Sequence, residues 1–333
     1  MSPIPLRKIG NADVPAIGFG VMGIAAAYGK VDSDEERLKV LDAAFAAGCT
    51  FWDTANVYGD SEDLIGKWFK ANPEKRSKVF LATKFGLTMT GAKGDPEYVK
   101  EAAAQSLARL GVDYIDLYYQ HRVDANTPIE KTVGAMAELV KEGKVKYLGL
   151  SDCTADGLRR ANAVHPIAAL QVEFSPLMLE VEKPPLDLVK TAREFGTKII
   201  AYSPLGRGFL TGQIRSINDL EADDFRRTVP KFSEQNFPKI LDLASKIAEV
   251  GKAHNATAGQ TTLAWILAQG DDFFAIPGTK KIKYLQENVG AANVKLTPEE
   301  VAQVRKVAEA AEIPGDRYGA GWNEMTYVDS PPL

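Results

Sequence analysis

The chain has 333 residues, a formal net charge of −4 at pH 7 and a sequence pI near 5.6. This acidic balance gives no electrostatic basis for binding nucleic acid or an anionic membrane surface, and no window approaches the roughly 18 apolar residues of a membrane span. Two cysteines, Cys49 and Cys153, are too few for a disulfide framework or a metal quartet, and the first residues lack the apolar run of a signal peptide. We therefore expect a cytoplasmic protein.

Eight short apolar runs predict the strands of a sheet, because each is near-continuous, as in strands covered on both faces. In chain order they span residues 16–22, 49–55, 79–85, 114–121, 145–152, 167–175, 197–205 and 272–279. Helical patterns lie between them, and the clearest span residues 33–48, 95–111, 127–144, 256–270 and 281–291. The first helix opens on Ser33 with Glu36 three residues later, the pattern of a capping box, and stops at Gly48. The second has Asp95 as its cap and Gly111 as its stop.

The alternation of strands and helices implies that the strands pair in parallel. Eight such units without a linker-like stretch favour one closed (β/α)8 barrel, a TIM barrel, over residues 1–333. The alternative is a doubly wound sheet, and the first strand does carry the letters G-x-G-x-x-G from Gly18 to Gly23. That alternative also needs an acidic residue for the ribose in a following βαβ unit, and the candidate there, Asp53, is assigned to a different role.

Two stretches exceed the minimal barrel. Residues 206–255 form a long insertion of loop and helix after the seventh strand, and residues 297–333 form an extra C-terminal helix and an aromatic, glycine-rich tail. Long loops in compact domains are usually functional or disordered. We expect both stretches near the barrel mouth or its underside, and we hypothesise that Arg226 and Arg227 flank the cofactor or the substrate.

Polar residues at the carboxyl ends of the predicted strands form an acid–base set, and the chemistry of such barrels lies at that end. A tyrosine such as Tyr58 is a poor proton donor at its usual pKa near 10, and a nearby ammonium such as Lys84 lowers that pKa. The carboxylate of Asp53 would hold the lysine charged, and His121 could polarise a carbonyl. Each residue alone has an ordinary structural explanation. Together they favour protonation of a carbonyl oxygen, with a hydride supplied by a cofactor.

Seven ordered motifs give the chain a resemblance to the aldo-keto reductase superfamily over nearly its whole length. They are D-T-A-x-x-Y-G (Asp53 to Gly59), A-T-K (Ala82 to Lys84), D-L-Y-Y-Q-H (Asp116 to His121), G-L-S (Gly149 to Ser151), Q-V-E-F-S (Gln171 to Ser175), Y-S-P-L-G-x-G (Tyr202 to Gly208) and I-P-G-T (Ile276 to Thr279). The sequences around His121 and Thr279 resemble in particular a microbial and plant branch that reduces aldehydes and is similar to pyridoxal reductases.

The resemblance implies a reversible, NADPH-dependent reduction of an aldehyde or ketone to an alcohol. The implied catalytic residues are Tyr58 as general acid, Lys84 and Asp53 as its tuning pair, and His121 as the group that orients the carbonyl. The implied cofactor-binding residues are Gly20, Met22, Ser151, Gln171, Tyr202, Ser203, Pro204, Leu205, Gly206, Gly208, Gly278, Thr279, Lys280, Tyr284, Glu287 and Asn288. Within this set, residues 151 and 171 would hold the nicotinamide carboxamide, and residue 202 would stack on the ring. Residues 203–208 would follow the pyrophosphate, 278–280 the adenosine 2′-phosphate, and 287–288 the adenine.

Two positions depart from the family pattern. Asp152 stands where the family often has asparagine, and Tyr284 stands where an arginine or glutamine often occurs. Tyr284 could stack on adenine but brings no charge, so Lys280, Lys281 and Lys283 would supply the charge for the 2′-phosphate. These lysines favour NADPH over NADH.

Two other functions stay open at this level. The chain could be an NADPH-binding regulatory subunit with residual reductase activity, as some relatives are channel partners, or a class I aldolase that forms a Schiff base on Lys84. Three scattered histidines argue against a metal hydrolase. For the reductase we expect a small-molecule carbonyl substrate such as an aromatic or pyridoxal-like aldehyde. The residues expected to select it are Met22, Tyr28, Tyr58, Phe85, Arg122 and the insertion 206–235.

Overall fold

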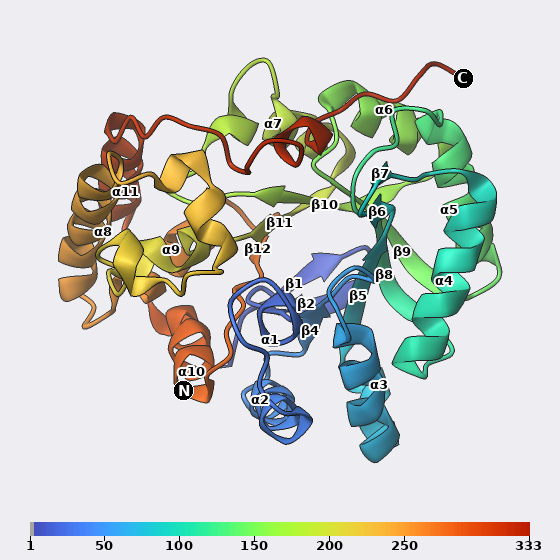
Figure 1. Cartoon of the computed structure of the whole chain (residues 1–333), viewed down its shortest axis with the longest axis horizontal. Helices are drawn as coiled ribbons and strands as arrows, with labels where there is room; N and C mark the ends of the chain where they lie inside the picture. Colours follow the sequence, from blue (N-terminus) through green and yellow to red (C-terminus); the bar gives the residue numbers. More distant parts are fainter. Residues whose placement is uncertain (1–2) are drawn as a thin grey trace.

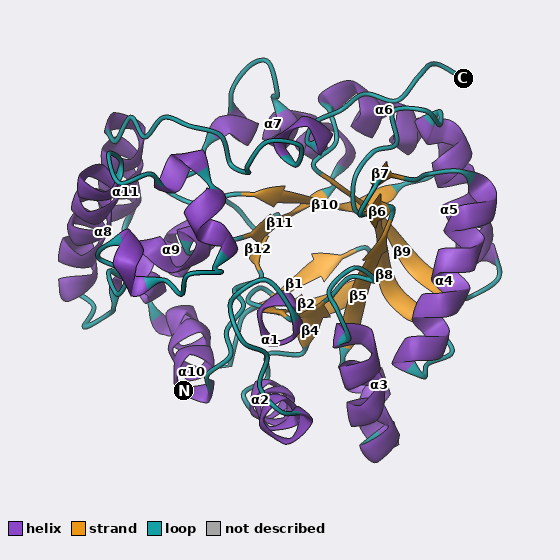
Figure 2. Cartoon of the chain, viewed as in Figure 1, coloured by secondary structure: helices purple, strands orange, loops and turns teal. Residues whose placement is uncertain are grey.

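The computed structural model describes residues 3–333, in which eight parallel strands form one curled sheet (Figures 1 and 2). The strands are β3 (Phe19–Gly20), β4 (Phe51–Asp53), β5 (Phe80–Phe85), β8 (Ile115–Gln120), β9 (Val145–Ser151), β10 (Ile167–Glu173), β11 (Lys198–Tyr202) and β12 (Phe273–Ala275). They pair in chain order, so each of the eight predicted strands is confirmed. The predicted (β/α)8 architecture is confirmed with them.

The barrel closes where the first strand meets the last. Ile17 forms a parallel bridge with Ala275, and the Gly18 amide donates a hydrogen bond to the Ala275 carbonyl at 2.8 Å. A Cβ added to Gly278 would lie 2.7 Å from the Gly20 carbonyl oxygen, so this close approach requires glycine. Gly20 of the first strand serves barrel closure in the same way, because its added Cβ would lie 2.8 Å from the Ile276 carbonyl oxygen, and the doubly wound alternative is wrong.

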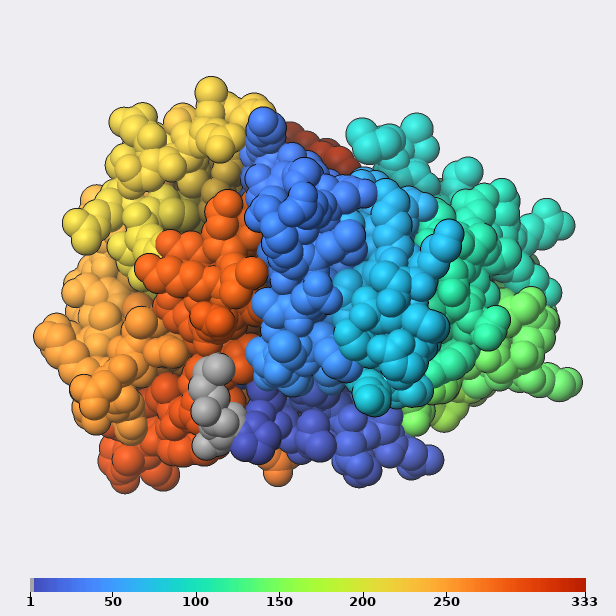
Figure 3. All heavy atoms as spheres, turned by 90° about the horizontal axis from the view of Figure 1, so that it is seen from below, coloured from blue at the N-terminus to red at the C-terminus, as the bar shows by residue number. Residues whose placement is uncertain are grey.

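A helix follows each strand of the barrel. These helices are α2 (Asp34–Ala46), α3 (Ser61–Ala71), α4 (Pro96–Leu110), α5 (Ile129–Lys141), α6 (Ala155–Val164), α7 (Leu188–Phe195), α9 (Ala258–Leu267) and α10 (Ile282–Gly290). The five predicted helices are confirmed, and α3, α6 and α7 lie outside the predicted ranges. Space-filling atoms show α2 and α10 packed side by side, so the ring of helices closes as the sheet does (Figure 3).

The capping signals are confirmed in part. Asp95 accepts a hydrogen bond from the Tyr98 amide at 3.0 Å, and Gly111 ends α4 in the left-handed region with φ 62°. Ser33 accepts from the Glu36 amide at 3.4 Å, which gives half of the predicted capping box. The Glu36 carboxylate does not return the bond, because it accepts from Lys39 at 2.7 Å instead.

A hairpin that the sequence analysis did not identify closes the end of the barrel where the strands begin. It consists of β1 (Leu6–Ile9) and β2 (Ala12–Pro15), paired antiparallel. Ile9 and Val14 are fully buried in the barrel interior with Phe51 and Phe274. A second, larger apolar layer fills the space between the strands and the surrounding helices. The mouth at the other end is therefore the open end.

The insertion and the C-terminal tail both lie at this mouth. The insertion contains four short 3-10 turns, η3 (Gly206–Thr211), η4 (Ile217–Asp219), η5 (Phe225–Thr228) and η6 (Pro230–Phe232), and then α8 (Phe237–Lys252). The extra helix α11 (Pro298–Ala310) packs on α8, and the tail then crosses the barrel end (red in Figure 1). The Tyr327 amide donates to the Asp152 carbonyl at 2.8 Å, just after β9. The insertion and the tail therefore lie at the barrel mouth and not at its underside.

Smaller elements complete the mouth. They are α1 (Met22–Ala25), the two-stranded ribbon β6 (Leu87–Thr88) and β7 (Gly91–Ala92), and the turn η8 (Asn323–Met325) in the tail. Across residues 3–333, none of the helices is both long enough and apolar enough to cross a bilayer.

Replacing Gly20 with alanine should destabilise the closed barrel. The new Cβ would lie 2.8 Å from the Ile276 carbonyl oxygen, a backbone atom directly after β12 that cannot move away cheaply. We expect a loss of about 2 kcal/mol in the free energy of unfolding, measured by denaturant titration. The matched control is Gly134→Ala in α5, where the new methyl meets no atom of residues 3–333 within 4 Å. Equal stability of the two variants would contradict this account of closure.

Candidate active site

A buried ion pair lies at the ends of β4 and β5. The Lys84 side chain is 0% exposed, and its ammonium donates to the Asp53 carboxylate and, at 2.8 Å, to the Thr54 carbonyl. The other oxygen of Asp53 accepts from Gln171 Nε2 at 2.8 Å. Burial raises the pKa of the Asp53 carboxyl and lowers the pKa of the Lys84 ammonium, and the ion pair opposes both shifts. The lysine is thus buried and paired, as its place at the end of an apolar strand predicts.

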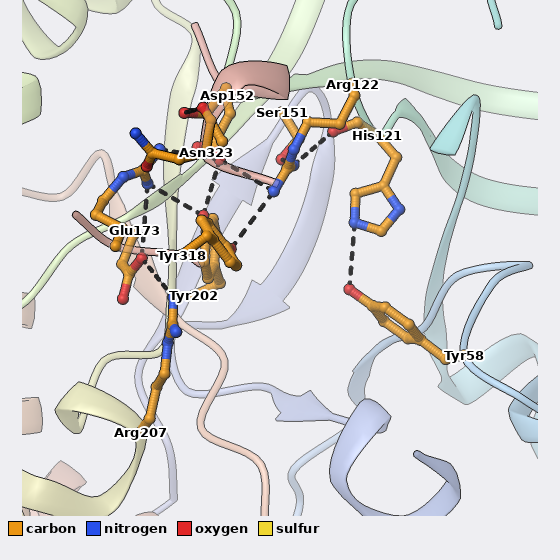
Figure 4. Close-up of polar contacts among 12 residues, drawn as sticks. Tyr58, His121, Arg122, Ser151, Asp152, Glu173, Tyr202, Arg207, Tyr318 and Asn323 are labelled. Carbon is orange, nitrogen blue, oxygen red and sulfur yellow. Dashed lines mark hydrogen bonds and ion pairs between the residues drawn. The ribbon is translucent and has the colours of Figure 1, made fainter. Parts of the chain in front are cut away.

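Tyr58 and His121 meet beside this pair (Figure 4). Tyr58 Oη lies 3.4 Å from His121 Nε2, and the two rings are nearly perpendicular at 85°. Lys84 Nζ lies 5.0 Å from the centroid of the Tyr58 ring. The structure therefore brings together the four residues that the sequence analysis nominated as catalytic, from the ends of β4, β5 and β8.

The protonation states differ from the expected ones in one respect. Burial, and next the negative charge of Asp53, raise the pKa of the Tyr58 hydroxyl well above its usual value. The net shift of this pKa is therefore opposite to the one expected from Lys84, because burial and the negative charge of Asp53 dominate it. Burial, followed by the charges of Arg122 and Lys84, lowers the pKa of His121 well below its usual range. Near neutral pH the site therefore holds a protonated tyrosine and a neutral imidazole.

An elongated cleft of about 400 Å³ begins at this site and runs toward the start of α10. Thirteen of the sixteen predicted cofactor-binding residues line it: Gly20, Met22, Tyr202, Ser203, Pro204, Leu205, Gly208, Gly278, Thr279, Lys280, Tyr284, Glu287 and Asn288. The other three lie behind its wall: the side chain of Gln171 is bound to Asp53, Ser151 accepts from Arg122 at 3.4 Å, and Gly206 is buried.

The loop after β11 has an unusual backbone. Ser203, Gly206, Arg207 and Gly208 have φ values of 48°, 55°, 55° and 97°. Residues with side chains rarely adopt this left-handed region, and the strain is typical of functional sites. The amides of Gly206 and Gly208 donate to the carbonyls of Ser203 and Leu205 at 2.9 and 3.0 Å, so the loop is a tight turn held by its own backbone. Its glycines leave room for a pyrophosphate to approach the backbone closely.

Lys280 spans the far part of the cleft. Its ammonium donates to the Tyr28 carbonyl and, at 2.8 Å, to the Lys30 carbonyl. Its predicted partner, an anion at the start of α10, would compete with these two carbonyls. Lys281 Nζ lies 3.7 Å from an Asp32 oxygen, so the two lysines face the same loop.

The mouth cluster is a group of five buried charged residues beside Tyr58: Arg122, Asp152, Glu173, Arg207 and Arg317 (Figure 4). Asp152 lies 3.2 Å from Arg122 and 3.5 Å from Arg317, and it accepts from the Tyr202 hydroxyl at 2.8 Å. Glu173 lies 3.1 Å from Arg207 and 3.6 Å from Arg317. The acidic residue that departs from the family pattern is therefore the partner of two buried arginines.

Only some of the residues expected to select the substrate line the cleft. Met22, Tyr28 and Tyr58 line the cleft. Phe85 does not, because it is fully buried and stacks on Tyr118 with ring centroids 4.9 Å apart. Its inclusion among them was wrong.

Arg226 and Arg227, which we expected to flank the cofactor or the substrate, differ in their position relative to the cleft. Arg226 lines the cleft, whereas Arg227 donates to the backbone carbonyls of Leu220 and Glu221, away from it. Arg207 lines the cleft although the sequence analysis did not single it out. The sequence feature that could have indicated Arg207 is its position as the variable residue x of the motif Y-S-P-L-G-x-G. Among residues 3–333, no group of three or more His, Cys, Asp or Glu side chains is arranged to hold a metal ion.

Lys84→Met should cost roughly 3 to 5 kcal/mol of unfolding free energy, because it leaves the Asp53 carboxylate buried without its cation. The double variant Lys84→Met with Asp53→Asn should regain most of that loss, since neither partner then carries a charge. Denaturant titration of the two variants and the wild type gives the comparison. A single variant as stable as the wild type would show that the pair is not a structural requirement.

The imidazole of His121 should stay neutral as the pH falls through 6.5, where an ordinary histidine gains its proton. Its pKa in the folded protein lies well below 6.5, so acidification through 6.5 protonates the histidines of the unfolded chain but not this one. Nitrogen-15 NMR of the histidine side chains measures this, with His121→Asn to identify the resonance and the protein in urea as reference. A midpoint near 6.5 in the folded protein would contradict the burial argument.

Comparisons with known proteins agree with this geometry. A sequence model described as the aldo/keto reductase family matches residues 16–309. The chain is 66% identical over 336 residues to the aldo-keto reductase str7 of Strobilurus tenacellus and 48% identical over 338 residues to the aldo-keto reductase yakc [NADP(+)] of Schizosaccharomyces pombe, each over 99% of both chains. A glycerol dehydrogenase from Gluconobacter oxydans superposes with a TM-score of 0.83 at 26% identity, over 94% of this chain and 98% of that one. The chain belongs to the aldo/keto reductase family.

Proposed function

We propose that this protein is a single-domain enzyme that reduces an aldehyde or ketone to an alcohol, reversibly, with NADPH as its cofactor. The observation that carries the proposal is the protonated Tyr58 hydroxyl 3.4 Å from the neutral imidazole of His121, at one end of the cleft. A carbonyl oxygen placed between these groups would meet one acid and one hydrogen-bonding partner. The proton donor and its neutral neighbour support carbonyl reduction, and the elongated cleft beside them supports an extended cofactor.

The residues of the cleft fit an extended dinucleotide. Tyr202 and Ser203 lie at the end nearest Tyr58, and the residues around Lys280 and Tyr284 lie at the other end. When bound, NADPH supplies the hydride. The loop 203–208 would hold the pyrophosphate, and Lys280 would exchange its backbone carbonyl partners for the 2′-phosphate. The relative whose name specifies NADP(+) is 48% identical, which supports this choice of cofactor.

The four proposed catalytic residues divide the work. Tyr58 Oη gives its proton to the carbonyl oxygen as that oxygen gains negative charge. The phenolate left behind lies close to the Lys84 ammonium, which stabilises it, while Asp53 keeps the ammonium charged and fixed. His121, being neutral, can donate one hydrogen bond to the substrate oxygen without releasing a competing proton. Burial thus keeps the proton on the tyrosine before the reaction. The lysine stabilises the phenolate that forms during it, which is a separate effect.

The alternatives are less well supported. A Schiff base on Lys84 would need access to its amine, but the ammonium is fully buried and bound to Asp53 and Thr54. A regulatory subunit would need no proton donor, yet Tyr58 is paired with His121 at the cleft. Four tyrosines line the cleft, and Tyr28, Tyr58 and Tyr202, which lie apart from the adenine end at Tyr284, favour an aromatic aldehyde as substrate. The two cysteines are buried free thiols, which is in keeping with a cytoplasmic location.

Tyr58→Phe should lower kcat for aldehyde reduction by about 10²- to 10⁴-fold, because only the proton donor is lost and the ring remains. NADPH oxidation followed at 340 nm with a panel of aldehydes gives kcat, and fluorescence titration gives the Kd for NADPH, which should change little. Tyr98→Phe, at a tyrosine within α4, is the matched control.

The two readouts separate the candidate functions. If the wild type binds NADPH and reduces nothing, the regulatory-subunit function is favoured. If the wild type does not bind NADPH, the assignment of the cleft is wrong.

A further inference from the structure

The mouth cluster contains three guanidinium groups and two carboxylates. Asp152 is shared by Arg122 and Arg317, and Glu173 is shared by Arg207 and Arg317. The neighbouring Arg226 has its own acid, Asp224, at 2.6 Å and adds no net charge. A buried, uncompensated positive charge is costly, so the cluster is suited to receive one anionic group.

Within residues 3–333, three atoms of the mouth cluster have no hydrogen-bond partner: Arg207 Nη1, Arg317 Nη2 and Asp152 Oδ1. Of these three residues only Arg207 lines the cleft. This side chain is 2% exposed and donates through Nη2 to Glu173, whereas Nη1 has no hydrogen-bond partner within residues 3–333. Figure 4 shows the side chain reaching from the insertion toward Glu173, beside Tyr318 and Tyr202. Arg207 thus presents a buried N–H donor without an acceptor at the edge of the site.

The position of Arg207 indicates which end of the cleft the anion would occupy. Its guanidinium lies 4.6 Å from the centroid of the Tyr318 ring, and the Tyr318 hydroxyl lies 3.0 Å from that of Tyr202. Tyr202 lies at the reacting end, whereas Lys280 and Tyr284 lie at the other. An anion bound by Arg207 would therefore sit within reach of a substrate at Tyr58.

We propose that Arg207 binds a carboxylate on the carbonyl substrate, so that the enzyme favours aldehydes or ketones that carry an acid group. This inference rests on the proposed reductase function and names its substrate class. Phe225 and Phe232 lie 5.3 and 5.7 Å from the guanidinium and exclude water, which strengthens a charge-assisted bond there. The same chemistry could come from the cofactor pyrophosphate, and the experiment separates the two sources.

The test compares 4-carboxybenzaldehyde with its uncharged methyl ester as substrates. For the wild type we expect kcat/KM to be about tenfold or more higher for the acid. Arg207→Met should lower kcat/KM for the acid by about ten- to hundredfold, mainly through KM, and affect the ester much less. The Kd for NADPH, measured by fluorescence, should shift less than about twofold.

Two further variants protect the test against misfolding and nonspecific charge effects. Arg207→Lys keeps a cation for Glu173 and removes the second nitrogen of the fork, so it should also lose the preference for the acid. Arg215→Met removes an exposed arginine from the same insertion and should keep the preference.

Three outcomes would overturn the inference. One is a wild type that reduces the ester as well as the acid. Another is an Arg207 variant that weakens NADPH binding and slows both substrates equally, which would assign the free nitrogen to the pyrophosphate. A wild type that binds NADPH but reduces neither compound would contradict the proposed function, and the substrate class would fall with it.

Discussion

The site depends on one constraint, which is that a charge buried in the barrel mouth must have a partner of opposite sign. Lys84 follows an apolar strand and is fully buried, so Asp53 must lie at the end of the neighbouring strand. Gln171 occupies the remaining oxygen of Asp53 and is thereby fixed from the opposite side of the barrel. The pair also acts on Tyr58, because the negative charge of Asp53 adds to the effect of burial in keeping the phenol protonated. The same rule orders the mouth cluster, where Asp152 and Glu173 each serve two arginines.

Much of the fold and of the site could be read from the sequence. The eight apolar runs became strands because each is buried on both faces, and the nominated acid–base residues meet because the ends of parallel strands converge. The error at Phe85 was avoidable. Side chains alternate along a strand, so if Lys84 points into the barrel its neighbour must point outward into the helical layer. The expected pKa shift of Tyr58 had the wrong sign for a different reason, because it considered the charged neighbours and left out burial, which is the largest effect.

Other features of the site could not be predicted from the residues that neighbour them in the sequence. The C-terminal tail reaches the site through contacts such as that of Tyr327 with Asp152, and nothing near either residue in sequence predicts the partner. The reason for an acid at position 152 became visible only when Arg122 and Arg317 were seen on either side of it. The glycines of the first strand show the opposite case. Their letters match a dinucleotide motif, yet Gly20 lets the first and last strands approach, and Gly18 lets the first strand lie close to Phe51 of the second.

The attachment of the tail has a consequence for how the protein matures. The tail forms a bridge between Cys153 and Val328, donates from Tyr327 to Asp152, and contributes Ser330 as acceptor for the first amide of α5. Arg317 is the only tail residue of the mouth cluster, and the ribosome adds it after every strand of the barrel has been made. Until then Asp152 and Glu173 lack the cation that they share. The mouth therefore acquires its final electrostatics only near the end of synthesis, when every strand of the barrel has already been translated.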